Sequence, residues 1–196
     1  MKRPGVWTWA FWNSSLVTTI IGSLVFASLV SLVVVLIAHN LEKKRKLFDF
    51  QLEMYRSFIT VSNSALGQLL AVQGGRSIRS EREYKAEVTR ARQAPDVLRA
   101  TNYQIEAAFR DDSMHLDMNE LLLVTWKLLE GTTRDPPASD KEIDPLHRRY
   151  RVIATIMEVK MMREMGLIDK GFAAAAVQML AKKLEETGTE KPRAGR

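Results

Sequence analysis

One long apolar run dominates the beginning of the chain. Leu16–Ala38 contains 23 residues rich in Leu, Val and Ile, and no charged side chain occurs between Phe11 and Ala38. About 20 apolar helical residues cross the hydrocarbon core of a bilayer. A cleaved signal sequence has a shorter apolar region that ends in small residues. The pattern therefore predicts one uncleaved transmembrane helix within residues 1–40.

Aromatic and basic residues flank this run on opposite sides. Three tryptophans precede it, Trp7, Trp9 and Trp12, and four consecutive basic residues follow it, Lys43, Lys44, Arg45 and Lys46. Indole rings favour the headgroup region, and excess Lys and Arg mark the cytoplasmic side. We therefore expect an inner (plasma) membrane protein of bacterial type with its N-terminus outside and its C-terminal domain in the cytoplasm. The basic cluster is expected to set this topology and to contact anionic lipid.

Small side chains recur every four residues inside the predicted span. Because a spacing of four drifts by about 40° per step on a 3.6-residue helix, only the centre of the row fits one helix crossing. Its members are Thr19, Gly22, Ser23 and Ala27. Small residues let two membrane helices approach closely, so this row predicts association of the span with itself or with a larger complex. The alternative is a lipid-facing row whose hydroxyls bond to their own backbone.

The segment after the basic cluster has the pattern of an amphipathic helix. Its apolar positions follow spacings of four and three with one polar member, at Phe48, Leu52, Tyr55, Ile59, Ser62, Leu66 and Leu69. This heptad-like repeat predicts a juxtamembrane helix over residues 41–75, ended by Gly74-Gly75. The helix would form one stripe of a local bundle or, as the alternative, a short oligomeric stalk.

Further helical patterns fill residues 76–187. Residues 77–93 predict a solvated helix or connector ended by Pro95, and residues 96–110 a separate helix. Asp112 or Ser113 is expected to cap the next helix, which ends at Gly131. Asp144 and Pro145 are expected to open a helix that breaks at Gly166. The last helix covers residues 170–186, and residues 188–196 form a polar tail.

No sustained two-residue alternation of apolar and polar positions occurs, so no strand is expected. The predicted fold is all-α: one N-terminal transmembrane helix followed by a cytoplasmic bundle of about five helices. The predicted regions are the anchor (1–40), the juxtamembrane helix (41–75), the helical domain (76–187) and the tail (188–196).

Charge is distributed in blocks along the 196 residues. The chain has a net charge of +6 and no cysteine, so disulfides and thiolate metal sites are excluded. Residues 101–145 are acidic, and the segments on both sides are basic. Alternating blocks are typical of helices that complement one another, whereas nucleic-acid binding requires a continuous basic face. We therefore expect no nucleic-acid partner.

Two Asp-x-x-His pairs are the strongest candidates for metal chemistry. Asp112 precedes His115 and Asp144 precedes His147 by three residues, and Glu106 or Glu158 could add a ligand. Di-iron bundle proteins use a similar Glu-x-x-His spacing. Because both aspartates fall where helix caps are expected, we interpret them as capping residues and both histidines as surface residues. No metal, cofactor or catalytic residue is predicted.

Two other patterns in residues 146–180 have a structural interpretation. The methionines at positions 157, 161, 162 and 165 are expected to pack against the Ala-rich last helix. A groove for a partner helix is the alternative. The basic run at 147–151 is expected to form a solvated face that pairs with the acidic segment.

The sequence predicts a binding protein and no enzyme. We expect a single-pass scaffold, accessory or regulatory subunit that contacts membrane lipids and forms a homo-oligomer or joins a larger membrane complex. The alternative is a membrane-perturbing defence or toxin effector, or its immunity partner, acting through assembled spans.

Overall fold

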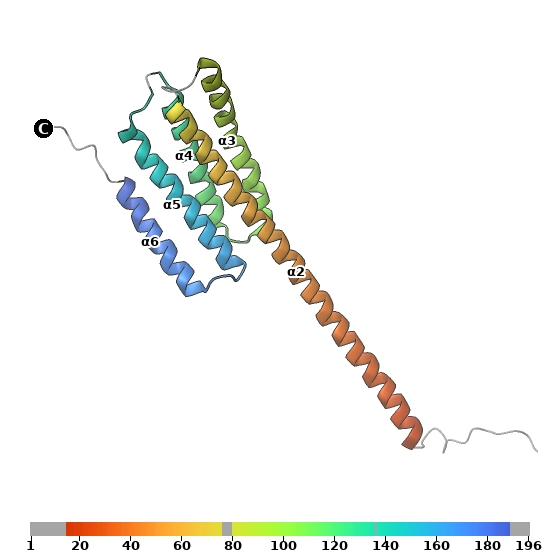
Figure 1. Cartoon of the computed structure of the whole chain (residues 1–196). Helices are drawn as coiled ribbons and strands as arrows, with labels where there is room; N and C mark the ends of the chain where they lie inside the picture. The colour runs from red at the N-terminus through yellow and green to blue at the C-terminus, as the bar shows by residue number, and fades with distance from the viewer. Residues whose placement is uncertain (1–14, 76–79, 136, 189–196) are drawn as a thin grey trace, which may run out of the picture. The chain divides into compact units, whose positions relative to one another are not determined.

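The computed structural model describes the backbone of residues 15–75, 80–135 and 137–188, and the side chains of residues 25–75, 80–135 and 137–186. Within these ranges the chain forms five α-helices and no strand, which confirms the all-α prediction (Figure 1). The helices are α2 (Ser15–Gly75), α3 (Glu81–Ala108), α4 (Ser113–Thr133), α5 (Asp140–Glu164) and α6 (Lys170–Gly188). The chain divides into two compact units, residues 1–47 and 48–196.

The second unit is a helical bundle around one apolar core. The part of α2 from residue 48 onward packs with α3, α4 and α5, and α6 packs on α5 (Figure 1). Side chains from all four inner helices are fully buried, including Phe58, Leu69, Leu98, Ile105, Met118, Leu121, Ile153 and Met157. Burial of this apolar surface is the main favourable contribution to folding. The bundle interpretation is therefore confirmed for residues 48–75, whereas residues 41–47 belong to the first unit and are exposed.

The buried stripe of α2 differs in register from the predicted one. Phe58 is fully buried, whereas Ile59 and Tyr55 are only half-buried. In the part of α2 from residue 48 onward, the buried side chains are Gln51, Met54, Phe58, Ser62, Ala65, Leu66, Leu69 and Val72. The predicted members Ser62, Leu66 and Leu69 are therefore buried. The predicted stripe was wrong by one position in its first half, because two adjacent rows of this helix are apolar and the pattern alone does not choose between them.

Helix α3 is longer than predicted. It begins at Glu81 with a capping box in which the Ser80 N–H donates to Glu83 Oε2 at 3.1 Å. It then continues through Pro95 to Ala108, so the predicted break at Pro95 was wrong. A proline in a helix interior costs about 3 kcal/mol. Here Ala91, Ala94 and Leu98 are buried around it, and their packing offsets that cost.

Helix α5 begins one turn earlier than predicted. The Ser139 N–H donates to Glu142 Oε2 at 2.8 Å, and the helix starts at Asp140, which places Pro145 inside it. Asp144 is therefore no cap. At the start of α4, Asp112 makes no capping bond, and the Ser113 N–H donates to Asp111 Oδ1 at 3.0 Å. The predicted cap at Asp144 was therefore wrong, whereas Asp112 holds the N-cap position of α4 without a side-chain capping bond.

The connection from α5 to α6 follows the predicted positions. Gly166 has a φ of 72°, a left-handed conformation that glycine adopts without strain. Asp169 then accepts hydrogen bonds from the backbone N–H groups of Gly171 and Phe172, so it opens α6 as expected. Met157 and Met161 are fully buried in α5, which confirms their role in the core.

Three ion pairs join the acidic α4 region to the basic α5. Arg149 pairs with Glu120, Lys160 Nζ lies 2.5 Å from Asp117 Oδ2, and Arg163 lies 2.5 Å from Asp111. The predicted pairing of the basic run with the acidic segment is therefore confirmed for Arg149. These side chains are half-buried or more, so solvent screens their attraction less than at an open surface.

Candidate functional site

The first unit presents an exposed apolar helix surface. From Val25 to Ile37 every large apolar side chain of α2 is exposed, and a window of this helix has a mean hydropathy of 2.0 with none of it buried. The uncharged helical stretch from residue 15 to residue 38 is about 36 Å long at 1.5 Å per residue. A hydrocarbon core is about 30 Å thick. This helix is therefore long and apolar enough to span a membrane.

The predicted membrane residues are described only in part. Ala27 is exposed on α2. The side chains of Thr19, Gly22 and Ser23 lie outside the described part of the structure, although their backbone is helical. The predicted aromatic anchor, Trp7, Trp9 and Trp12, lies wholly outside the described residues.

The basic cluster lies exposed on α2, just beyond the apolar surface. Lys43, Lys44, Arg45 and Lys46 are all exposed, and Lys46 pairs with Glu42 at 2.7 Å. Such an exposed pair contributes little to stability, so it holds Lys46 only weakly. Because all four basic side chains are exposed, the cluster is accessible to a negatively charged surface.

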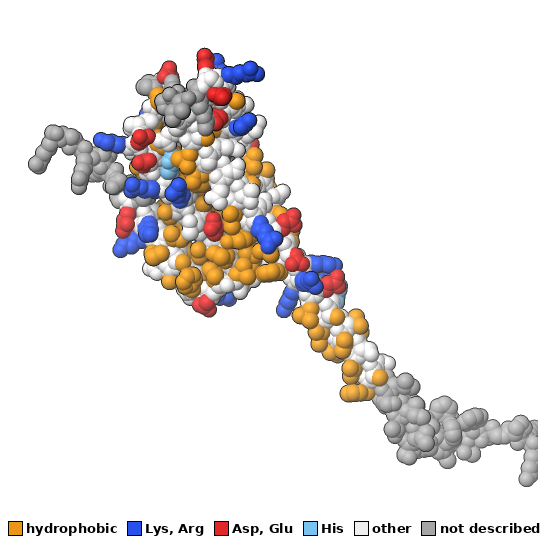
Figure 2. Space-filling model, in the orientation of Figure 1, with side chains coloured by type: hydrophobic (Ala, Val, Ile, Leu, Met, Phe, Trp, Pro, Cys, Tyr) orange, Lys and Arg blue, Asp and Glu red, His pale blue; other side chains and the backbone are white. Residues whose placement is uncertain are grey.

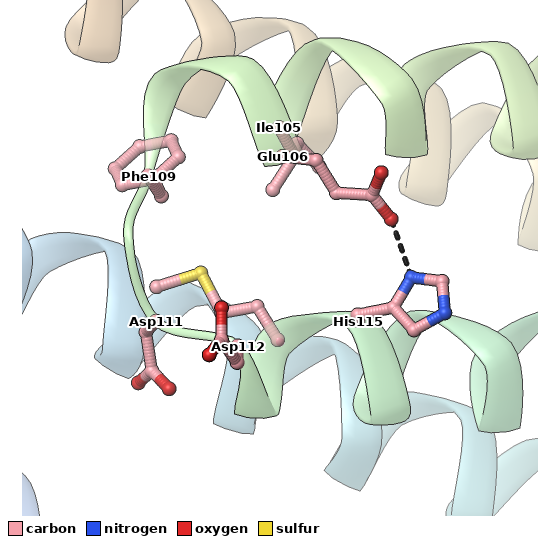
Figure 3. A pocket seen from close by; sticks show the side chains of 7 residues that line it. Ile105, Glu106, Phe109, Asp111, Asp112 and His115 are labelled. Carbon is pink, nitrogen blue, oxygen red and sulfur yellow. Dashed lines mark hydrogen bonds and ion pairs between the residues drawn. The ribbon is translucent and has the colours of Figure 1, made fainter.

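A pocket in the second unit lies at the turn between α3 and α4. It encloses about 400 Å³, with an apolar part formed by Ile105, Phe109 and Met114 and a polar rim that includes His115 (Figure 3). The acidic members of the rim are Glu106, Asp111 and Asp112. Figure 3 shows the Glu106 carboxylate and the His115 ring pointing toward one another from α3 and α4.

Both ring nitrogens of His115 have partners at this pocket. Nδ1 contacts the Glu106 carboxylate, and Nε2 lies 2.9 Å from the Asn119 amide nitrogen. A histidine that activates a nucleophile needs one nitrogen facing that nucleophile. Here Nε2 accepts a hydrogen bond from the Asn119 amide on the same helix, so neither nitrogen faces a nucleophile. The contact between Nδ1 and Glu106 joins α4 to α3.

The two Asp-x-x-His pairs are not brought together. Asp112 and His115 both line the pocket with Glu106. Arg163 on α5 lies next to the pocket, since it pairs with the pocket residue Asp111. His147 lies 16 residues before Arg163 on the same helix, a distance of about 24 Å, so it is far from the pocket. Among the described residues no group of three or more His, Asp or Glu side chains is placed to hold a metal ion.

The structure buries His147, contrary to the expected surface position. Its Nε2 has no hydrogen-bond partner in the described structure. Burial lowers the pKa of His147, Arg151 lowers it further, and Asp144 acts in the opposite direction. The surface prediction was wrong because His147 shares one face of α5 with Ile143 and Tyr150, which are both fully buried.

A half-buried carboxyl group lies on α5 further along the chain. Burial raises the pKa of Glu158. Burial also raises the pKa of Tyr55 on α2, and the negative charge of Glu158 raises it further. Tyr150, also on α5, is almost fully buried, and burial raises its pKa as well. Glu158 on α5 and Tyr55 on α2 are therefore close enough to interact electrostatically.

The outer face of α4 carries exposed apolar residues that the sequence pattern did not single out. Leu116, Leu123 and Trp126 lie seven and three residues apart, so they share one face of the helix, and Trp126 is 45% exposed. Tryptophan is enriched among residues that dominate binding energy at protein interfaces. Their spacing of seven and three residues could have predicted this shared face. It was not recognised because apolar residues occupy most positions of this helix, so the pattern did not distinguish the exposed face from the buried one.

No protein-family model matches the chain, and no significant match was found among the curated proteins or the solved structures.

Proposed function

We propose that the chain is a single-pass protein of the inner membrane whose helical second unit binds other proteins, as a scaffold, accessory or regulatory subunit. The observation that carries this proposal is the exposed, uncharged surface of α2 from Val25 to Ile37. An apolar surface of this length is stable only in an apolar environment such as lipid. The second unit buries an apolar core of its own.

The basic cluster supports the proposed orientation. Four exposed basic residues at 43–46 follow the uncharged stretch, and such clusters remain on the cytoplasmic side during insertion. The second unit then lies in the cytoplasm, and the cluster faces anionic headgroups.

The outer face of α4 supports a binding role for the second unit. Leu116, Leu123 and Trp126 are exposed on a helix that otherwise buries its large apolar side chains. A partner would be a second copy of the chain or another membrane protein, since both share the membrane plane with it.

Alkaline extraction of membranes, followed by labelling of single cysteines, tests the anchor and its orientation. The chain has no cysteine, so Gln104→Cys introduces a unique label on the exposed side of α3. We expect the protein to stay in the membrane pellet and the cysteine to react only after the membrane is permeabilised. Release into the supernatant would contradict the anchor, and labelling of intact cells would contradict the orientation.

A membrane-perturbing effector or its immunity partner is the second candidate. Ala27 and Ser31 are exposed on the apolar helix, and small residues permit close assembly of several spans. Overexpression with a membrane-potential dye separates the two candidates. A scaffold leaves the potential unchanged, whereas an assembled pore depolarises the membrane rapidly.

A further inference from the structure

The turn between α5 and α6 exposes two large apolar side chains. Leu167 is 51% exposed and Phe172 is 65% exposed, and Lys170 is exposed between them. The turn is closed by a hydrogen bond from the Leu167 N–H to the Met162 carbonyl at 2.9 Å. Figure 2 shows that apolar side chains gather over one end of the second unit. A well-defined turn with exposed Leu and Phe is a surface that water solvates poorly.

This turn lies at the end of the second unit where α2 enters it. Gln51 Nε2, near the start of that part of α2, donates to the Ala108 carbonyl at the end of α3 at 2.9 Å. The Arg110 N–H, two residues further, donates to Glu164 at 3.2 Å, at the end of α5. Two hydrogen bonds therefore bring together the end of α3, the end of α5 and the first turn of α2 within the second unit.

A short stretch of chain connects this end of the unit to the proposed membrane span. The uncharged stretch ends at Ala38 and the second unit begins at Phe48, ten residues later. Ten helical residues rise about 15 Å. The headgroup and interfacial region adds several ångströms to each side of the hydrocarbon core. If the stretch before Ala38 spans the membrane, the ten residues that follow it tether this end of the second unit to the bilayer surface.

The charges of the turn are compatible with a headgroup layer. One carboxylate oxygen of Asp169 already accepts two backbone N–H groups, and Lys170 next to it is exposed. Asp49 and Asp112 lie exposed at the same end and oppose attraction to anionic lipid. Burial of Leu167 and Phe172, with a local contact from Lys170, is therefore the interaction that this surface offers.

We propose that the α5–α6 turn docks on the cytoplasmic surface of the membrane. Leu167 and Phe172 enter the interfacial region, and the Lys170 ammonium group contacts lipid phosphate. The docking rests on the proposed membrane anchor and adds a second, reversible contact between the bundle and the bilayer. It fixes the direction in which the outer face of α4 is presented to partners.

Site-specific fluorescence in vesicles tests the docking. Because the chain has no cysteine, Phe172→Cys, Met179→Cys and Val33→Cys each give the full chain one label with an environment-sensitive nitrobenzoxadiazole dye. Met179 is the matched control, since it lies seven residues along the same face of α6 and is 57% exposed. Quenching by lipids that carry a spin label near the headgroup then reports contact with the bilayer.

We expect strong quenching and blue-shifted emission at position 172, and several-fold weaker quenching at 179. Equal quenching at both positions, strong or weak, would overturn the docking of the turn. The Val33 label reports the anchor separately, through spin labels placed deep in the acyl chains. No quenching there would overturn the anchor together with the docking, whereas a quenched Val33 label with equal signals at 172 and 179 leaves the anchor intact.

The contribution of Lys170 is measured with the label at 172. Vesicles of phosphatidylcholine are compared with vesicles that also contain phosphatidylglycerol. We expect quenching to increase with the anionic lipid, and Lys170→Gln to remove that increase. An increase that survives Lys170→Gln would contradict the phosphate contact.

Discussion

Tyr150 on α5 donates its hydroxyl hydrogen to the backbone carbonyl of Ser62 on α2 at 2.8 Å. Both residues are buried, and 88 positions separate them in the chain. The bond gives a buried hydroxyl its partner and joins the first helix of the second unit to α5. Ser62 was the one polar member of the predicted α2 stripe, and its small side chain leaves the carbonyl accessible to the tyrosine.

Tyr150→Phe should lower the free energy of unfolding by about 1 kcal/mol, because it removes this bond and keeps the buried ring. Urea unfolding of the full chain in detergent micelles, followed by far-UV circular dichroism, measures the change. Tyr103→Phe is the control, since Tyr103 is exposed on α3. An equal loss in both variants would show that the Tyr150 bond contributes nothing specific.

Phe58→Ala should cost about 3–5 kcal/mol, because a fully buried ring is lost and a cavity is left in the core. Ile59→Ala removes a half-buried side chain next to it and should cost roughly half as much or less. The two unfolding midpoints measured under the same conditions test the register of α2. A larger loss for Ile59→Ala would restore the stripe expected from the sequence.

His147 should make the second unit less stable in mild acid. Burial holds its folded-state pKa below the ordinary value of 6.5. Below pH 6.5 the unfolded chain therefore binds a proton more readily than the folded chain, and the free energy of unfolding falls with pH. His147→Leu removes this proton binding, so its stability should decline less between pH 7 and the onset of carboxyl titration.

Gln104→Leu is the control for that pH series. Gln104 is exposed and carries no ionisable group, so its replacement should leave the pH dependence equal to that of the unchanged chain. Unfolding midpoints at several pH values provide the readout. A His147→Leu curve that runs parallel to the unchanged chain would contradict the account.

Lys160→Met should lower the free energy of unfolding by about 2 kcal/mol. Lys160 donates to Asp117 at 2.5 Å and to the Ser113 hydroxyl at 2.8 Å, and both charged side chains are mostly buried. Burial already raises the pKa of Asp117 with the lysine present, so losing the cation leaves a poorly solvated carboxylate. Lys85→Met breaks an exposed pair with Glu81 and should leave the unfolding midpoint unchanged.

The sequence predicted the features that depend on local composition. The uncharged stretch of α2, the end of that helix at Gly75 and the break at Gly166 follow from residues whose chemistry acts at their own position. Helix α5 starts at Ser139-x-x-Glu142, which has the spacing of a capping box, whereas the predicted start was Asp144-Pro145. Two valid start signals one turn apart differ by too little energy for pattern alone to decide.

Features that depend on tertiary packing were predicted less well. Pro95 continues a helix because Ala91, Ala94 and Leu98 are buried around it, and no local signal reports that burial. The buried position of His147 and the contact between His115 and Glu106 likewise depend on how helices face one another. The candidate residues of the span remain predictions, because Thr19, Gly22 and Ser23 lack described side chains.

The central claim, that the second unit binds a protein at the membrane, is tested most directly by photo-crosslinking in native membranes. A photoreactive phenylalanine at Leu123 or Trp126 probes the outer face of α4, and one at Gln104 on α3 is the exposed control. Mass spectrometry identifies the adducts. The account predicts adducts with a second copy or with another membrane protein from positions 123 and 126 and fewer from 104. Adducts that are absent, or equally frequent at all three positions, would contradict it.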